Sequence, residues 1–99
     1  MNVRFSPRAK RRVATINKWW RANRPATPDL FERELTEVTG KLAATPTLGT
    51  IHDTVRGKVV LRLLLSRSEQ HLYYSVDKKA GEVRVITVWG ARRGRLPKL

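Results

Sequence analysis

Apolar residues recur along this chain at two spacings, one typical of helices in the first half and one typical of strands in the second. Two stripes spaced by four, three and four residues are Ala9, Val13, Ile16 and Trp20, and Phe31, Leu35, Val38 and Leu42. Residues at these spacings fall on one face of a helix. The pattern therefore predicts two amphipathic helices, and each of them needs a partner for its apolar face.

Proline-containing boundaries separate the two predicted helices. Ser6 followed by Pro7 indicates a helix start, because a serine side chain caps the first backbone N–H groups and proline suits the first helical position. Thr27 followed by Pro28 repeats this signal. The segment 23–28 contains two prolines, which interrupt a helix. Two amphipathic helices joined by such a short loop should pack as an antiparallel hairpin.

The strand-like spacing belongs to runs of β-branched and aromatic residues separated by turn residues. The predicted strands are Asn2 to Phe5, Val59 to Leu65, His71 to Val76 and Glu82 to Trp89. Residues 50–57 are expected to form a loop, and the basic tail 94–99 is expected to be flexible or peripheral. The predicted fold class is α+β, in a single domain spanning residues 1–99. An N-terminal strand and a two-helix antiparallel hairpin precede a three-stranded antiparallel meander, and the helices cover one face of the sheet.

Positive charge is the dominant feature of the composition. There are 21 Lys and Arg residues against 8 Asp and Glu, which gives a net charge of +13. Such a charge favours an anionic partner, whether nucleic acid, a ribosome or an acidic protein, and it does not indicate a fold. The chain has no cysteine, which excludes thiolate sites and favours the reducing cytoplasm. No apolar run approaches the ~18 residues of a membrane span, so no membrane partner is expected.

Metal and cofactor motifs are missing from the sequence. His52 and His71 are far apart along the chain, without the spacing of a paired-histidine helix or a zinc finger. No glycine motif for phosphate binding is present either. We therefore expect neither a bound metal nor a cofactor.

A basic and aromatic set on or beside the predicted sheet is the main candidate for chemistry. Its members are Lys58, Arg62, Arg67, His71, Tyr73, Tyr74, Arg84, Arg92 and Arg93. Arg62 interrupts the apolar run from Val59 to Leu65, so it is expected to face away from the helices. Side chains alternate along a strand, so His71 and Tyr73 share one face and Tyr74 takes the other. On an open face, guanidinium groups can hold RNA phosphates, while His or Tyr handles the proton of an attacking 2′-hydroxyl. The alternative is that the tyrosines are core residues and the arginines serve solubility.

The order of the elements resembles the RelE/ParE family of small bacterial toxins. The local matches are VRFSPRAKRRV at residues 3–13, HLYYSVD at 71–77 and EVRVITVWGARRG at 82–94. The resemblance implies the toxin of a type II toxin–antitoxin pair, neutralised by a cognate antitoxin. It also implies that the complex binds operator DNA through the antitoxin and not through the toxin.

The resemblance leaves two mechanisms open. RelE-like members are ribosome-dependent endoribonucleases that cleave mRNA with basic residues and a C-terminal Arg and Tyr or His. ParE-like members lack that set and poison DNA gyrase. This chain has no Tyr after Tyr74 and no His after His71. We therefore favour a ParE-like gyrase inhibitor. A ribosome-dependent mRNA endoribonuclease and a simple basic nucleic-acid-binding module are the alternatives, so whether the protein is an enzyme stays open.

Each mechanism comes with its own candidate residues. For a RelE-like enzyme the catalytic candidates are Arg62, His71, Arg92 and Arg93. The candidate partner-binding residues, for the antitoxin or the target, are Trp19, Trp20, Arg84, Trp89 and Arg92. Adjacent helical residues point about 100° apart, so one of the two neighbouring tryptophans should pack on the core while the other lies at its margin. A role for either ring in base stacking is an alternative.

Overall fold

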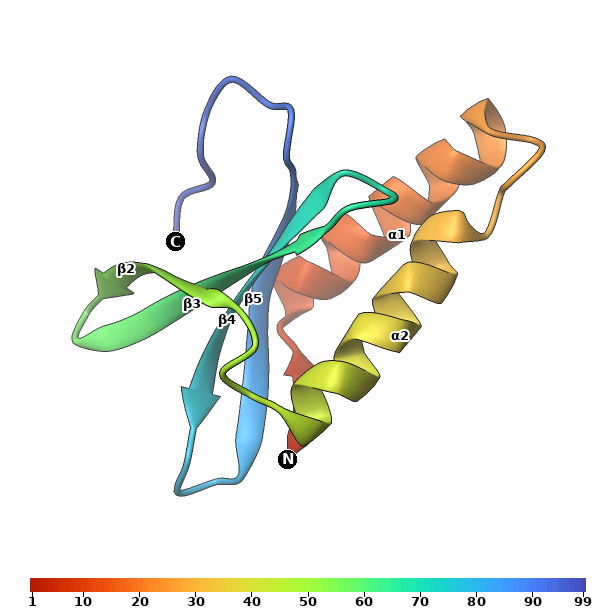
Figure 1. The fold of residues 1–99 in the computed structure, drawn as a ribbon. Helices are drawn as coiled ribbons and strands as arrows, with labels where there is room; N and C mark the ends of the chain where they lie inside the picture. The colour runs from red at the N-terminus through yellow and green to blue at the C-terminus, as the bar shows by residue number, and fades with distance from the viewer.

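Two helices lie side by side on one face of a five-stranded sheet (Figure 1). The computed structural model describes residues 1–99. The elements in chain order are β1 (Asn2–Phe5), α1 (Pro7–Asn23), α2 (Leu30–Ala44), β2 (Thr50–Val55), β3 (Lys58–Leu65), β4 (Gln70–Asp77) and β5 (Glu82–Gly90). The sheet order is β1-β5-β4-β3-β2, with β1 parallel to β5 and every other pair antiparallel. The predicted α+β fold class is confirmed.

Ser6 fixes the start of α1 and also ties it to the sheet. Its hydroxyl oxygen accepts the backbone N–H of Ala9 at 3.0 Å, and the hydroxyl donates to the carbonyl of Ile86 at 2.8 Å. The predicted cap is therefore confirmed. The corresponding prediction for α2 is wrong: that helix begins at Leu30, after Asp29, and Asp29 makes no side-chain capping bond.

The core fills the space between the helices and the sheet. Both predicted helical stripes face it, with Val13 and Val38 partly buried. The buried cluster consists of Ala9, Ile16, Trp20, Phe31, Leu35, Leu42, Leu65, Leu72, Tyr74, Val83, Val85 and Val88. Trp20 is buried and Trp19 is 47% exposed, as expected for adjacent helical residues. The helices therefore cover only one face of the sheet and leave the other face open.

The segment predicted as a loop at residues 50–57 is instead an edge strand with a tight turn. β2 pairs with β3, and Arg56 and Gly57 turn the chain with φ angles of 52° and 78°. Positive φ at both central residues is typical of a two-residue hairpin. The sequence pattern hides this strand because an edge strand buries little: Ile51 is 75% exposed. The predicted three-stranded meander therefore has a fourth strand.

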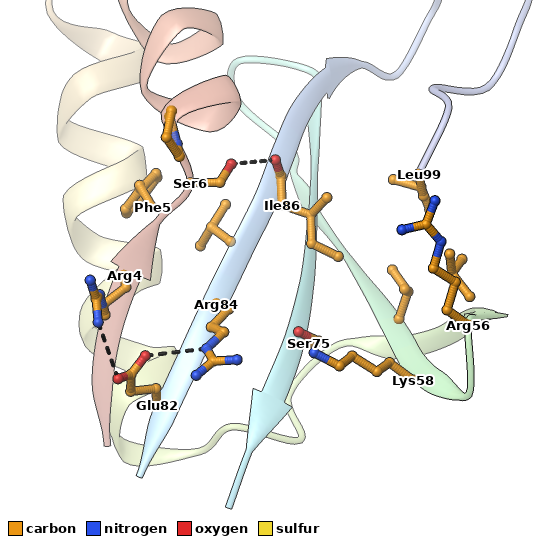
Figure 2. Close-up of a pocket in the computed structure, with 14 residues that line it drawn as sticks. Arg4, Phe5, Ser6, Arg56, Lys58, Ser75, Glu82, Arg84, Ile86 and Leu99 are labelled. Carbon is orange, nitrogen blue, oxygen red and sulfur yellow. Dashed lines mark hydrogen bonds and ion pairs between the residues drawn. The ribbon is translucent and has the colours of Figure 1, made fainter. Parts of the chain in front are cut away.

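Beyond β5 the chain turns back along the open face. The indole N–H of Trp89 donates to the carbonyl of Arg95 at 2.9 Å, and Arg8 donates to the carbonyl of Lys98. Pro97 is buried, and Leu99 reaches the neighbourhood of Arg56 (Figure 2). The tail is thus peripheral to the sheet and held by contacts at several points. Neither helix has the length and apolar character needed to cross a membrane.

Candidate functional site

Strand pairing gathers polar and aromatic side chains on the open face of the sheet. Arg62 of β3, Tyr73 of β4 and Thr87 of β5 lie opposite one another in one row. His71 and Trp89 form a neighbouring cross-strand pair on β4 and β5. Because strand side chains alternate, these residues project away from the helices. The predictions that Arg62 faces away from the helices and that His71 and Tyr73 share a face are confirmed.

The ring of Tyr73 contacts two imidazoles on this face. The ring of His52 is 5.0 Å from the Tyr73 ring, centroid to centroid, and the ring of His71 is 6.2 Å away; both meet it edge-on, at 73° and 68°. Tyr73 is fully buried, yet its hydroxyl has no hydrogen-bond partner. Nearly all buried polar groups are paired, so an unpaired hydroxyl on a ring that contacts two histidines makes this part of the open face a candidate site. We call Arg62, His71, His52 and Tyr73 the histidine cluster.

The charges around His71 keep its imidazole neutral. Burial lowers the pKa of His71 below its ordinary value of 6.5, and the nearby cations Arg62 and His52 lower it further. At neutral pH the ring therefore has a free lone pair and can accept a proton. Arg62 forms no ion pair with any carboxylate, so its guanidinium is available to an anion. A proton acceptor, His71, and an unpaired cation, Arg62, therefore lie close to each other on the open face.

Trp89 extends the histidine cluster towards the C-terminal end of β5. Three guanidinium groups surround its ring, with Arg93 at 4.3 Å, Arg12 at 5.4 Å and Arg95 at 5.9 Å from the ring centroid. Arg93 is connected to the histidine cluster through Trp89, because Trp89 is the cross-strand neighbour of His71. Arg92 turns the other way and pairs with Glu69 at 2.7 Å. Of the four predicted catalytic residues, the structure brings Arg62 and His71 together and places Arg92 elsewhere.

A groove of about 570 Å³ occupies the opposite end of the open face (Figure 2). Arg84 lies in it but is held by carboxylates, with Asp77 at 3.0 Å and Glu82 at 3.3 Å. Glu82 also accepts a bond from Arg4 at 3.4 Å. Arg84 is thus neutralised within the protein, far along β5 from Trp89, and the structure does not group it with the other predicted partner-binding residues.

A second groove, of about 440 Å³, runs between α1, the β3–β4 turn and the end of β5. Three of the predicted partner-binding residues line it together: Trp19, Trp20 and Arg92. We call it the arginine–tryptophan groove. No member of the histidine cluster lines this groove, but Arg93 does, and Arg93 also stacks on Trp89, the cross-strand neighbour of His71.

His52 is the member of the histidine cluster that sequence reasoning missed. The long sequence separation from His71 argued against a shared site, but β2 folds back beside β3 and brings both rings within contact of Tyr73. The two-residue turn at its end would identify TIHDTV as a strand of a hairpin. It would not place His52, because the pairing with β3 shifts by one residue between Ile51 and Asp53. No three His, Asp or Glu side chains gather where they could hold a metal ion.

Comparison with known proteins gives a likeness of fold. No protein-family model matches this chain, and no curated protein sequence matches it. Among solved structures the chain is similar to the isolated RelE toxin of E. coli, with a TM-score of 0.53 and 23% sequence identity. The match covers 94% of this chain and 86% of that one. The whole chain therefore has a RelE-like fold.

Proposed function

We propose that this protein is the toxin of a toxin–antitoxin pair and that it cleaves mRNA on the ribosome, in the manner of RelE-like toxins. The observation that carries the proposal is the histidine cluster, in which a neutral imidazole stands beside an unpaired guanidinium on the open face. The RelE-like fold supports it. The gyrase mechanism favoured from the sequence has no comparable support, because it rested on a missing C-terminal imidazole. His52 and His71 supply two imidazoles from other strands.

The cluster contains the groups that RNA cleavage by internal attack requires. His71 takes the proton from a 2′-hydroxyl, the 2′-oxygen forms a bond to the adjacent phosphorus, and the bond to the 5′-oxygen breaks. His52, whose ring also contacts Tyr73, gives a proton to that leaving oxygen. Arg62 holds the phosphate and offsets the charge that develops on it. The products are a 2′,3′-cyclic phosphate and a 5′-hydroxyl, so the step needs no further reactant.

Tyr73 is a positioning residue in this proposal. Its ring contacts both imidazoles edge-on, and it is buried while they are only partly covered. The net charge of +13 suits a protein that works among ribosomal RNA, because it raises the rate of encounter with a polyanion.

Primer extension on mRNA that is being translated tests the proposal. We expect cuts in phase with the codons. We expect His71→Gln to reduce them by about 10²- to 10⁴-fold, because a general base is lost, and Arg62→Ala by about 10²- to 10³-fold, because charge stabilisation is lost. Arg33→Ala is the matched control, since Arg33 is exposed on α2 and pairs only with Asp29. The Arg33→Ala variant should cleave mRNA as efficiently as the unmodified protein.

Two further measurements separate the alternatives. Purified gyrase should supercoil DNA normally in the presence of the protein; inhibition, together with uncut mRNA, would replace this proposal with the gyrase mechanism. Co-expression with the protein encoded by the adjacent reading frame should relieve growth arrest if the two form a toxin–antitoxin pair. Arrest that persists with every neighbouring frame would remove the antitoxin from the proposal.

A further inference from the structure

The arginine–tryptophan groove carries far more positive charge than its own carboxylates offset. Five arginines line it, against one acidic residue, Glu69. The arginines are Arg12, Arg24, Arg67, Arg92 and Arg93. Glu69 is used by Arg92, and Arg67 is paired with Glu34 and Glu37 of α2. Arg12, Arg24 and Arg93 have no carboxylate partner, so the groove is a site for an anion.

The cations of the groove crowd one another. Arg12 donates through Nε to the carbonyl of Val88 at 3.0 Å, which fixes its guanidinium at the base of the groove. Burial lowers the pKa of Arg12, and the neighbouring Arg93 and Arg8 lower it further. A bound anion would relieve this repulsion, and planar guanidinium groups present paired donors that match phosphate oxygens.

Trp19 gives the groove a flat aromatic surface. Its indole is 47% exposed and rests edge-on against the buried Trp20, with ring centroids 5.7 Å apart. The guanidinium of Arg24 covers it at 5.2 Å from the ring centroid. An exposed indole supported from below and flanked by cations is typical of the surfaces on which nucleic-acid bases stack. The other two apolar residues of the groove, Ile16 and Trp20, are buried, so little apolar area remains for a peptide.

Trp89 and Arg93 link the groove to the histidine cluster. Trp89 is the cross-strand neighbour of His71, and Arg93 stacks on Trp89 at 4.3 Å while also lining the groove. A polymer of phosphates lying over Arg62 and His71 therefore finds an aromatic ring and then a series of guanidinium groups in the direction of α1. No carboxylate among the residues named interrupts this path before Glu69.

We infer that the arginine–tryptophan groove binds the nucleotides that flank the scissile phosphate on the same single strand of RNA. A base stacks on Trp19, and the phosphates are held by Arg93, Arg12 and Arg24. This assignment rests on the proposed function, since it extends the substrate site of the same reaction. It makes the substrate a single strand several nucleotides long, because both the phosphate chain and an unpaired base are recognised.

Binding can be measured separately from cleavage. Fluorescence anisotropy of a labelled single-stranded RNA of about 10 nucleotides reports the dissociation constant, in a His71→Gln background that keeps the strand intact. We expect Trp19→Ala to weaken binding by roughly 5- to 100-fold, the usual effect of losing one stacking contact. Trp19→Phe should restore most of the affinity, because a phenyl ring also stacks. Lys18→Ala is the matched control, an exposed cation on the same helix outside the groove, and should bind unchanged.

The outcomes distinguish the groove from the reaction. If RNA binding depends on Trp19 but no mRNA is cleaved on ribosomes, RNA binding by the groove is supported and the proposed function is rejected. If codon-phased cleavage is observed but Trp19→Ala binds RNA as tightly as the protein with Trp19, the assignment of the groove is overturned and the proposed function stands. A poly-glutamate peptide that binds at Trp19 while RNA does not, at low salt, also overturns the inference and assigns the groove to an acidic protein partner.

Discussion

Tyr73 and Tyr74 are neighbours in the chain and face opposite sides of the sheet, but only one of their hydroxyl groups is hydrogen-bonded. The Tyr74 hydroxyl donates to the carbonyl of Pro46 at 2.9 Å and accepts the backbone N–H of Gly49 at 2.8 Å. The Tyr73 hydroxyl has no partner. Both rings are fully buried, so exposure to water does not explain the difference. The Tyr74 hydroxyl therefore helps to hold the helix-covered side together, whereas the Tyr73 hydroxyl on the open face contributes no hydrogen bond to the fold.

Two charged residues, Glu34 and Arg62, show a similar contrast. On the helix side, Glu34 is buried and accepts three hydrogen bonds from the β3–β4 turn, from the backbone N–H groups of Arg67 and Ser68 and from the Ser68 hydroxyl, at 2.8, 2.8 and 2.6 Å. On the open side, Arg62 has no carboxylate partner. The contrast teaches that a buried charge can be purely structural, as at Glu34, whereas the Arg62 guanidinium is left free to hold an anion.

Removing the charge of Glu34 should have the largest effect on stability. We expect Glu34→Gln to lower the free energy of unfolding by about 2–4 kcal/mol, because an amide cannot accept all three bonds and leaves buried donors unpaired. Chemical denaturation followed by circular dichroism measures this. The control is Glu37→Gln, whose carboxylate is half-exposed and forms only surface ion pairs; it should lose less than about 1 kcal/mol. Equal losses would show that Glu34 is no more structural than its neighbour on α2.

Substitution of the two tyrosines offers the sharpest test of the contrast between their hydroxyl groups. Tyr74→Phe should lower the free energy of unfolding by about 1–3 kcal/mol, since it leaves the carbonyl of Pro46 and the N–H of Gly49 without a partner. Tyr73→Phe should change it by less than about 1 kcal/mol, in either direction, because the lost hydroxyl had no bond to lose. Thermal unfolding of both variants decides the matter. If Tyr73→Phe proved as damaging as Tyr74→Phe, its hydroxyl would be paired in solution and the contrast between the two tyrosines would fail.

The helix-covered side of the fold could be predicted from the sequence because the residues buried there recur at regular spacings. The stripes of α1 and α2 and the runs of β3 to β5 were found from apolar spacing alone. β2 shows no such spacing, since its residues are mostly exposed and its place depends on a turn at Arg56 and Gly57. The start of α2 was also misplaced, because Thr27 followed by Pro28 carries a start signal that the chain does not use.

The candidate site was only half predictable for the same reason. Alternation along β4 was enough to place His71 and Tyr73 on one face, and an arginine in an apolar run was enough to place Arg62 there. The position of His52 depends on the pairing of an edge strand that the pattern did not show. The separation of Arg92 from Arg93 depends on how the chain turns after Gly90, where the N–H of Arg93 donates to the Gly90 carbonyl at 3.2 Å. Neither follows from local spacing.

The pH dependence of stability gives the smallest effect and tests the electrostatics of the open face directly. The pKa of His71 is lowered in the folded state by burial, Arg62 and His52, so the unfolded chain binds the proton more readily. The stabilisation from neutral His71 is therefore fully present above the unfolded pKa and is lost as the pH falls towards the folded pKa. Unfolding free energies of the unmodified protein and His71→Gln, measured from about pH 8 to about pH 5, should diverge on the acid side, with the unmodified protein losing more. His52→Gln should reduce the divergence, because removing one neighbouring cation lets the pKa of His71 rise. Parallel curves for all three proteins would mean that burial, Arg62 and His52 do not lower the pKa of His71, and this account of the electrostatics of the open face would fail.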